Sequence, residues 1–392
     1  MKINYLIILI FHLVSLNTYS FSYYENEQTD IPLIDIKKTY PQKNIYLDNI
    51  ANIKYVPLYT SKDVLIGSIS YLTYVNDTII ICDRSTRTIF FFDNEGRYLN
   101  SFCQKGQSNS EYYDITAFGV DADNKEIYIA DYPTRYKIKV YNFDGVFLRG
   151  ISIKNIWPST LLNYDEDYLI TYDRKDDYNY NQKKFNNYPY VLINKKNGSI
   201  INLPLKIDKK ITNNYKINKD GTSLLTSLKM ETLIKSNKNI IISDFSKEDI
   251  FIYKNKKLLT IIKRKLGSDT DLSCVSWENI NYAFIHVEDK KNILPQKMES
   301  TEYKTNSKIL LLDKTNKNIY ETKLLLKDMP MLKDKIWNNY SKDIPDNHII
   351  FSLSAEELIK LFNKNEIYGP LKDIASRVKF DDNPILVIAE LK

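Results

Sequence analysis

The stretch TIIICDRSTRTIFFFDNEGRYLNSF, from Thr78 to Phe102, decides the fold because the chain repeats its pattern. The second copy, EIYIADYPTRYKIKVYNFDGVFLRGI, begins 48 residues later at Glu126. In both copies an apolar run ends at an aspartate, a polar turn follows, and a second apolar run leads into a turn that contains glycine. Branched and aromatic runs between Asp, Asn and Gly are typical of β-strands joined by tight turns.

Three looser copies follow, in which apolar runs end at Asp173, Asp244 and Asp289. Four antiparallel strands repeated about every 40 to 50 residues are the sequence mark of a β-propeller blade. A β-sandwich would space its strands evenly without this recurring order of aspartate, turn and glycine. Since one blade cannot bury both of its faces alone, the pattern predicts a ring of blades.

The number of blades follows from the two ends of the repeat. Five copies lie between Gly67 and about Leu326, which leaves one apolar strand before them (Asn52–Thr60) and an incomplete blade after them that ends in NPILVIAELK. Pairing these two ends removes an exposed sheet edge. We therefore predict an all-β, six-bladed propeller of four-stranded antiparallel blades over residues 50–392, with the last blade closed by the N-terminal strand.

Three segments interrupt the repeat. The stretch 352–364, SLSAEELIKLFNK, predicts one short helix, because Ser354 and Glu357 form a capping box. The polar stretches 173–189 and 289–307 fall between the second and third strands of blades 3 and 5. We expect loops there, either as tolerated insertions or as lids on one face.

The first 20 residues are typical of an export signal. Lys2 precedes the apolar run Tyr5–Val14, and Thr18 and Ser20 suit cleavage after Ser20. The apolar run is short for a bilayer span, and no cysteine near the cleavage site could carry a lipid. These features predict a soluble exported protein, periplasmic or secreted, with an N-terminal extension over 21–49 and no transmembrane segment in the mature chain.

Composition narrows the partners. The net charge of +6 is spread along the chain without a dense basic run, which argues against nucleic acid. Three histidines are few for a histidine-built metal site or base. Cys82, Cys103 and Cys274 are an odd number, so at least one thiol is free or pairs with another molecule. We expect a monomer.

One group of residues is a candidate binding site. In a propeller, the turns after the second strands and the links between blades emerge on one face, so their arginines and tyrosines should gather near the channel mouth. Arginines there could hold a carboxylate, sulfate or phosphate, or could instead pair with neighbouring aspartates. We interpret the repeated aspartates themselves as architecture, because they recur in every blade. The predicted ligand-binding residues are Arg84, Arg87, Glu111, Tyr112, Tyr132, Arg135 and Arg174.

The sequence contains no glycine-rich phosphate loop, no cysteine pair with metal spacing and no Gly-x-Ser-x-Gly elbow. The leading hypothesis is therefore a non-catalytic protein that binds a glycan, a peptide, an anionic small molecule or another protein, without a cofactor. The alternative is a calcium-dependent propeller hydrolase or lactonase-like enzyme, whose carboxylates and amides would converge on one ion.

The chain also resembles the uncharacterised six-bladed β-propellers of exported bacterial proteins, which are distantly similar to NHL repeats. The similarity covers most of the mature chain, including YVPLYT (55–60), FFDNEGRYL (91–99), KGQSNSEYYDI (105–115) and DDNPILVIAELK (381–392). The third segment departs from the family, since Ser108, Asn109 and Ser110 replace the usual turn glycines and proline. The resemblance implies the fold and no particular activity.

Overall fold

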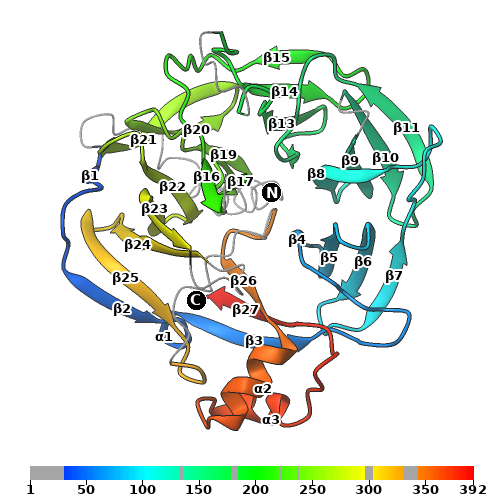
Figure 1. The fold of residues 1–392 in the computed structure, drawn as a ribbon, viewed down its shortest axis with the longest axis vertical. Coiled ribbons are helices and arrows are strands. Elements are labelled where there is room, and N and C mark those ends of the chain that lie inside the picture. The colour runs from blue at the N-terminus through cyan, green and yellow to red at the C-terminus, as the bar shows by residue number, and fades with distance from the viewer. Residues whose placement is uncertain are drawn as a thin grey trace, which may run out of the picture.

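Six β-sheets are arranged as blades around a central channel in the computed structural model of the protein (Figure 1). The structure describes residues 31–132, 136–177, 184–219, 222–236, 238–295, 303–330 and 343–392. The predicted signal lies outside these residues. The all-β, six-bladed propeller is confirmed.

Blades 1 to 3 each have four antiparallel strands, numbered outward from the channel. Blade 1 contains β4 (Tyr71–Val75), β5 (Thr78–Asp83), β6 (Thr88–Asp93) and β7 (Tyr98–Phe102). Blade 2 contains β8 (Asp114–Asp121), β9 (Glu126–Tyr132), β10 (Lys137–Asn142) and β11 (Phe147–Ser152). Blade 3 contains β12 (Leu162–Asn163), β13 (Tyr168–Tyr172), β14 (Tyr190–Asn194) and β15 (Ile200–Asn202).

Blades 4 and 5 gain a fifth, parallel strand from the N-terminal segment. Blade 4 contains β18 (Leu233–Ser236), β19 (Asn239–Ile242), β20 (Asp249–Lys254) and β21 (Lys257–Lys265), with β1 (Leu33–Asp35) on its outer edge. Blade 5 contains β22 (Asp271–Glu278), β23 (Tyr282–Pro295), β24 (Tyr303–Asp313) and β25 (Asn318–Leu325), with β2 (Gln42–Tyr46) outside it. Part of the segment 21–49, which we expected to be an N-terminal extension, therefore covers the outer edges of blades 4 and 5.

Blade 6 joins the two ends of the propeller, as the sequence predicted. In the described residues it contains β26 (His348–Leu353), β27 (Ile385–Leu391) and the outer strand β3 (Ala51–Pro57), which follows the short helix α1 (Leu47–Ile50). β3 and β27 pair along their whole length, from Ala51 opposite Leu391 to Pro57 opposite Ile385. Closure by the N-terminal strand is thus confirmed.

The continuous apolar runs of the sequence are explained by burial on both sides of a blade. In β5, Ile80 and Cys82 pack in the core between blades 1 and 2. The alternate residues Ile79 and Ile81 pack in the core between blades 1 and 6. Because neither side of the strand meets water, both sets of positions must be apolar.

Tight turns between the third and fourth strands require glycine, as blades 1 and 2 show. Gly96 and Gly145 have φ angles of +80° and +79°, a region that favours glycine. A Cβ on Gly96 would lie 2.3 Å from the carbonyl oxygen of Pro57 in the preceding blade. On Gly145 it would lie 2.5 Å from Phe102, again in the preceding blade. These two turns therefore pack closely against the preceding blade.

The strand order gives the ring two different faces. We call the side on which the second strand turns into the third the insertion face; the links between blades also emerge there. The opposite side, where the first strand turns into the second, is the plain face. In blade 1 the Asp83–Thr88 pair lies at the insertion face, and the Val75–Thr78 pair lies at the plain face.

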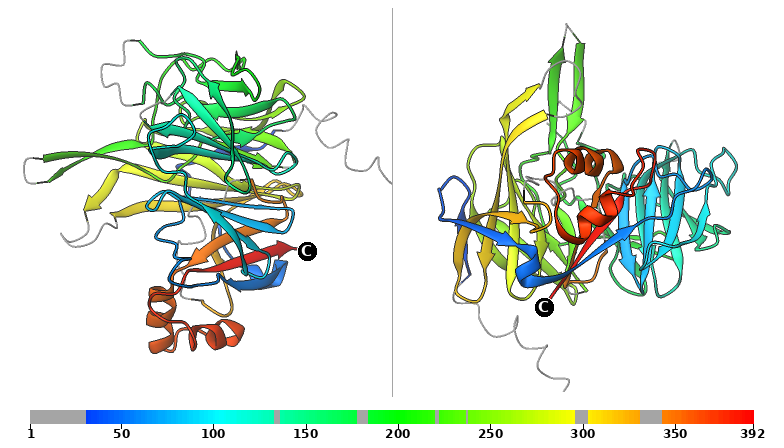
Figure 2. Two further views of the ribbon diagram at one scale, coloured as in Figure 1. Left: turned by 90° about the vertical axis from the view of Figure 1, so that its right-hand side faces the viewer. Right: turned by 90° about the horizontal axis from the view of Figure 1, so that it is seen from below.

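In the described part of the chain, the long insertions emerge on the insertion face. The helices α2 (Ala355–Asn363) and α3 (Gly369–Ala375) connect β26 to β27, and the Ser354 hydroxyl caps α2 by accepting a bond from the Glu357 N–H. The hairpin of β16 (Asn214–Lys219) and β17 (Thr222–Ser227) links blades 3 and 4. Figure 2 shows this hairpin and the ends of β23 and β24 projecting on the same side.

Two expectations about these insertions were wrong in detail. The stretch 289–307 is largely strand instead of a loop, since β23 runs on to Pro295 and β24 begins at Tyr303. Two helices, instead of one, separate β26 from β27. The stretch 173–189 does connect β13 to β14, and its residues 178–183 lie outside the described part.

Candidate functional site at the insertion face

Four of the repeated aspartates are structural anchors. The carboxylate of Asp83 accepts hydrogen bonds from the Gly67 N–H (2.7 Å) in the preceding link and from the Ser85 N–H (2.8 Å) in its own turn. Asp131 accepts the N–H of Tyr113, and Asp173 accepts that of Trp157. Each aspartate thus ties a turn to the link that enters its blade. Asp244 accepts bonds within its turn, from the Ser246 N–H and hydroxyl, and one from the Tyr190 hydroxyl.

Asp289 does not follow this pattern, because β23 continues through it. It lies opposite Asp271 in the strand pair. In blade 5 the Asp271 carboxylate makes the anchoring contacts: it accepts the Ser268 N–H at 2.6 Å and pairs with Lys37 at 2.6 Å.

The arginines of blade 1 contact groups from blade 2. Arg84 is about two-fifths exposed, and its Nη2 lies 3.2 Å from Asp114 Oδ2. The Arg87 guanidinium lies over the Tyr113 ring, 5.7 Å from its centroid. The Nε of Arg87 is buried and has no hydrogen-bond partner among the described residues. Both arginines are thus positioned by blade 2, and Arg84 remains partly open to solvent.

The loop that carries Glu111 and Tyr112 is stabilised by hydrogen bonds of both side chains. Tyr112 is fully buried, and its hydroxyl donates to the Arg87 carbonyl at 2.8 Å. The Glu111 carboxylate accepts the Ser108 N–H at 3.0 Å, and this bond lowers the pKa of Glu111. Tyr112 therefore connects the loop to the turn that contains Arg87, while Glu111 makes a hydrogen bond within the loop.

The predicted residues of blade 2 are only partly described. Tyr132 is the last residue of β9 and pairs with Asp114 in the strand register. Arg135 lies outside the described residues. The next tyrosine, Tyr136, is 46% exposed at the same turn, so blade 2 offers an aromatic side chain to this face.

Arg174 belongs to a cluster in blade 3. Its guanidinium lies over the Trp157 ring, 5.3 Å from the centroid. Beside it, Lys210 Nζ lies 2.8 Å from Asp177 Oδ1, and the Tyr172 hydroxyl donates to the same oxygen at 2.9 Å. Burial raises the pKa of Asp177, although Lys210 opposes the rise.

Charged side chains from different blades influence the pKa of one tyrosine at the channel mouth. Tyr71, the first residue of β4, is largely buried, and burial raises its pKa. The charge of Glu231, just before β18, adds to this rise, whereas Arg84 and Arg174 oppose it. Charges from blade 1, blade 3 and the link into blade 4 therefore act on one point.

Sequence reasoning missed Lys210 and Glu231, both of which lie in the link between blades 3 and 4. That link departs from the repeat, so no blade position predicts where its side chains lie. Within the described ranges, no group of three or more His, Cys, Asp or Glu side chains could hold a metal ion. No helix in the same part of the chain is long and apolar enough to cross a bilayer.

Fold and site together define a six-bladed propeller with one elaborated, arginine-bearing face. Residues 31–390 match the model of a domain of unknown function, DUF4934. The chain belongs to this family.

Two solved structures share the fold. A candidate exported protein from Bacteroides fragilis NCTC 9343 is 17% identical, with a TM-score of 0.65 over 92% of this chain and 99% of that one. A member of the DUF4221 family from Bacteroides vulgatus ATCC 8482 is 10% identical, with a TM-score of 0.52 over 88% of this chain and 97% of that one. No curated protein matches.

Proposed function

We propose that this protein is an exported, non-catalytic binding protein that recognises an anionic ligand at the insertion face. The observation that carries the proposal is that the charges of Arg84 in blade 1 and Arg174 in blade 3 both oppose the rise in the pKa of Tyr71 at the channel mouth. The leader-like N-terminus and the exported structural neighbour support export.

The chemistry of this face suits anions with a flat or extended body. A guanidinium stacked on an aromatic ring, as Arg174 is on Trp157, keeps its N–H groups in a plane that matches a carboxylate, sulfate or phosphate. Tyr113 and Tyr136 are about half exposed beside Arg87 and the blade 2 turn, and such rings stack on sugars or peptides. An acidic glycan, an acidic peptide and a small anion all fit these contacts.

The test compares ligand binding by variants of the insertion face with binding by a control variant of the plain face. The mature chain is applied to glycan and peptide arrays that contain neutral and acidic members of each class. Arg84→Ala and Arg174→Ala should each weaken acidic hits about tenfold or more, the size of one lost charged hydrogen bond. Arg97→Ala is the matched control, because Arg97 pairs with Asp93 at 2.6 Å on the plain face.

Equal binding by all three variants would overturn the proposed face. Turnover of a lactone or ester substrate that requires calcium, together with a calcium-dependent rise in melting temperature, would favour a calcium-dependent hydrolase in place of a binding protein.

A further inference from the structure

Two links between blades place an aromatic ring at the same position of the repeat on the insertion face. The N–H of Tyr113, in the link into blade 2, donates to Asp131 at 2.8 Å. The N–H of Trp157, in the link into blade 3, donates to Asp173 at 2.9 Å. In blade 1 the equivalent N–H belongs to Gly67, which has no side chain. The anchoring bonds therefore give the neighbouring blades 2 and 3 one ring each at matching positions.

An arginine lies over each of these rings. The Arg87 guanidinium is 5.7 Å from the centroid of the Tyr113 ring, and Arg87 accepts the neighbouring Tyr112 hydroxyl on its carbonyl oxygen at 2.8 Å. The Arg174 guanidinium is 5.3 Å from the centroid of the Trp157 ring, and the Arg174 N–H donates to the Trp157 carbonyl at 2.9 Å. In both pairs the main chain of the arginine is therefore hydrogen-bonded to the link that carries the ring.

Among the described residues, these two guanidiniums lack a hydrogen-bond acceptor. The other described arginines each donate to a carboxylate or a carbonyl oxygen: Arg84, Arg97, Arg149, Arg264 and Arg377. Neither Arg87 nor Arg174 does so within the same ranges, and the Nε of each is buried without a partner there. Both side chains are partly exposed. Since a guanidinium carries its donors in a planar fork that matches a carboxylate or sulfate, each pair offers an anion a fork beside an aromatic ring.

The geometry points to an acidic oligosaccharide as the ligand of the insertion face, bound by the Arg87–Tyr113 and Arg174–Trp157 pairs at once. This inference rests on the proposed function and narrows its ligand. A sugar unit with a carboxylate or sulfate presents an apolar ring face beside an anionic group, which matches the ring and the guanidinium of each pair. Because packed sheets lie about 10 Å apart, pairs on neighbouring blades require a chain of several units.

An acidic peptide fits these contacts less well. Bound peptides commonly gain affinity from hydrogen bonds between their main chain and an open sheet edge or unused N–H groups. At each pair, two N–H groups of the link and the turn are already donated to the anchoring aspartate. A sugar does not need them, since Tyr113 is 45% exposed and can offer its ring and its hydroxyl directly. A small anion would use only one of the two pairs.

The experiment measures how affinity depends on the length of an acidic sugar. Isothermal titration calorimetry on the mature chain compares galacturonate with its hexamer, and the chondroitin sulfate disaccharide with the hexasaccharide. Cellohexaose is the uncharged control, and hexaglutamate is the acidic peptide. In at least one acidic series the long chain should bind at least about tenfold more tightly than the short one, because it reaches both pairs. A smaller gain in both series, which the number of units alone could provide, or equal binding of cellohexaose would overturn the proposal.

Variants of either pair should weaken the long chain more than the short one. Arg87→Ala or Arg174→Ala removes one of two contact points, so the hexamer should lose about tenfold and galacturonate no more than about threefold. Arg87→Lys keeps the charge without the planar fork and should not restore hexamer binding. Tyr113→Ala keeps the main-chain anchoring bond and should weaken the hexamer, whereas Tyr113→Phe should not. Arg97→Ala is the control and should change nothing. Melting temperatures verify folding, and the two Tyr113 variants decide if an arginine variant fails to fold.

The two proposals fail in different ways. Acidic probes that bind and are weakened by Arg84→Ala, without any effect of sugar length, would overturn only the two-point sugar site. Hexaglutamate that binds as tightly as the best acidic hexamer would replace the sugar by a peptide and leave the anion-binding face in place. No binding by any acidic probe, together with empty acidic arrays, would overturn both.

Discussion

The two faces of the ring are made from the same strands but differ in what the chain adds to them. On the plain face, short turns such as those after Val75 and Asp121 connect the strands, and buried ion pairs lie between blades. On the insertion face, a hairpin, two extended strands and two helices project from the ring (Figure 2). Loops that vary on a rigid scaffold are where propellers place recognition. The difference shows that the insertions are concentrated on one face, which is the face where we propose that a ligand binds.

The ion pairs of the plain face also differ among themselves, and burial is the reason. Lys195 of blade 3 lies 2.6 Å from Asp121 of blade 2, and both are almost fully buried. Burial raises the pKa of Asp121, but the contacts with Lys195 and Asn124 outweigh it and hold the pKa below the usual value. Lys54 lies at the same distance from Glu95, but both are about half exposed.

Lys195→Met should have the largest effect. The substitution leaves the Asp121 carboxylate buried without its cation, which typically costs about 3 to 5 kcal/mol. Lys54→Met is the matched control and should cost less than ~1 kcal/mol, because exposed pairs contribute little. Urea unfolding of both variants measures the difference. Equal losses would mean that burial does not distinguish the pairs on this face.

An anchor of the insertion face should have the next largest effect. In Asp83, Oδ2 accepts the Gly67 N–H and Oδ1 accepts the Ser85 N–H, so an amide can satisfy only one of them. Asp83→Asn should cost about 2 kcal/mol by leaving an N–H unpaired.

Asp93→Asn is the comparison on the plain face. Its backbone bonds, from Glu95 and Arg97, both go to Oδ1, which asparagine retains. We expect this variant to lose less than ~1 kcal/mol in the same urea assay. A smaller loss for Asp83→Asn than for Asp93→Asn would contradict the anchoring role.

Particular residues show how much of this could be predicted from sequence. The repeat around Asp83 predicted the blades, because a strand buried on both sides needs a continuous apolar run. The pairing of residues 51–57 with 385–391 was predictable because each end lacked a partner. The hairpin at 214–227 was missed, although Asp220-Gly221 between two strand-like runs is a hairpin signal.

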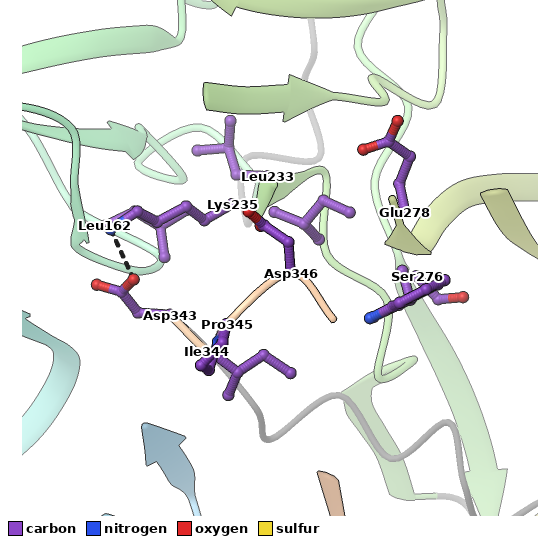
Figure 3. Close-up of a pocket in the computed structure, with 11 residues that line it drawn as sticks. Leu162, Leu233, Lys235, Ser276, Glu278, Asp343, Ile344, Pro345 and Asp346 are labelled. Atoms are coloured by element: carbon purple, nitrogen blue, oxygen red, sulfur yellow. Dashed lines mark ion pairs between the residues drawn. The ribbon is translucent and has the colours of Figure 1, made fainter. Parts of the chain in front are cut away.

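The site was less predictable than the fold. The arginine turns could be assigned to one face because antiparallel strands alternate direction. The effect of Arg84 and Arg174 on the pKa of Tyr71 depends on how blades 1 and 3 lie relative to each other across the channel, which no local pattern contains. A small pocket at the plain face (Figure 3) brings together Leu162, Lys235, Glu278 and Asp343, which are distant in sequence and have no common motif.

The smallest predicted effect distinguishes two anchors of the insertion face by the sign of their pH dependence. Burial raises the pKa of Asp173, and the N–H groups of Trp157 and Lys175, which both donate to Oδ1, only partly oppose it. The folded state therefore keeps the Asp173 proton to a higher pH than the unfolded state, so the wild type loses stability as pH rises through that window. Asp173→Asn keeps both backbone bonds and has no proton to lose. Its stability should match the wild type near pH 4 and slightly exceed it at pH 8, in urea unfolding at each pH.

Asp83 should show the opposite trend. Burial raises the pKa of Asp83, but hydrogen bonds from Ser85, Gly67 and Thr86 outweigh it, and the net shift is downward. Its stabilising contribution is present above the ordinary carboxyl pKa and is lost as pH falls, so the deficit of Asp83→Asn should shrink on acidification. A deficit of Asp173→Asn that grows with pH would show that Asp173 is needed as a charged group. Asp173 would then act as a charged group of the channel mouth, beside Arg174, and its role would not be limited to hydrogen bonding within the turn.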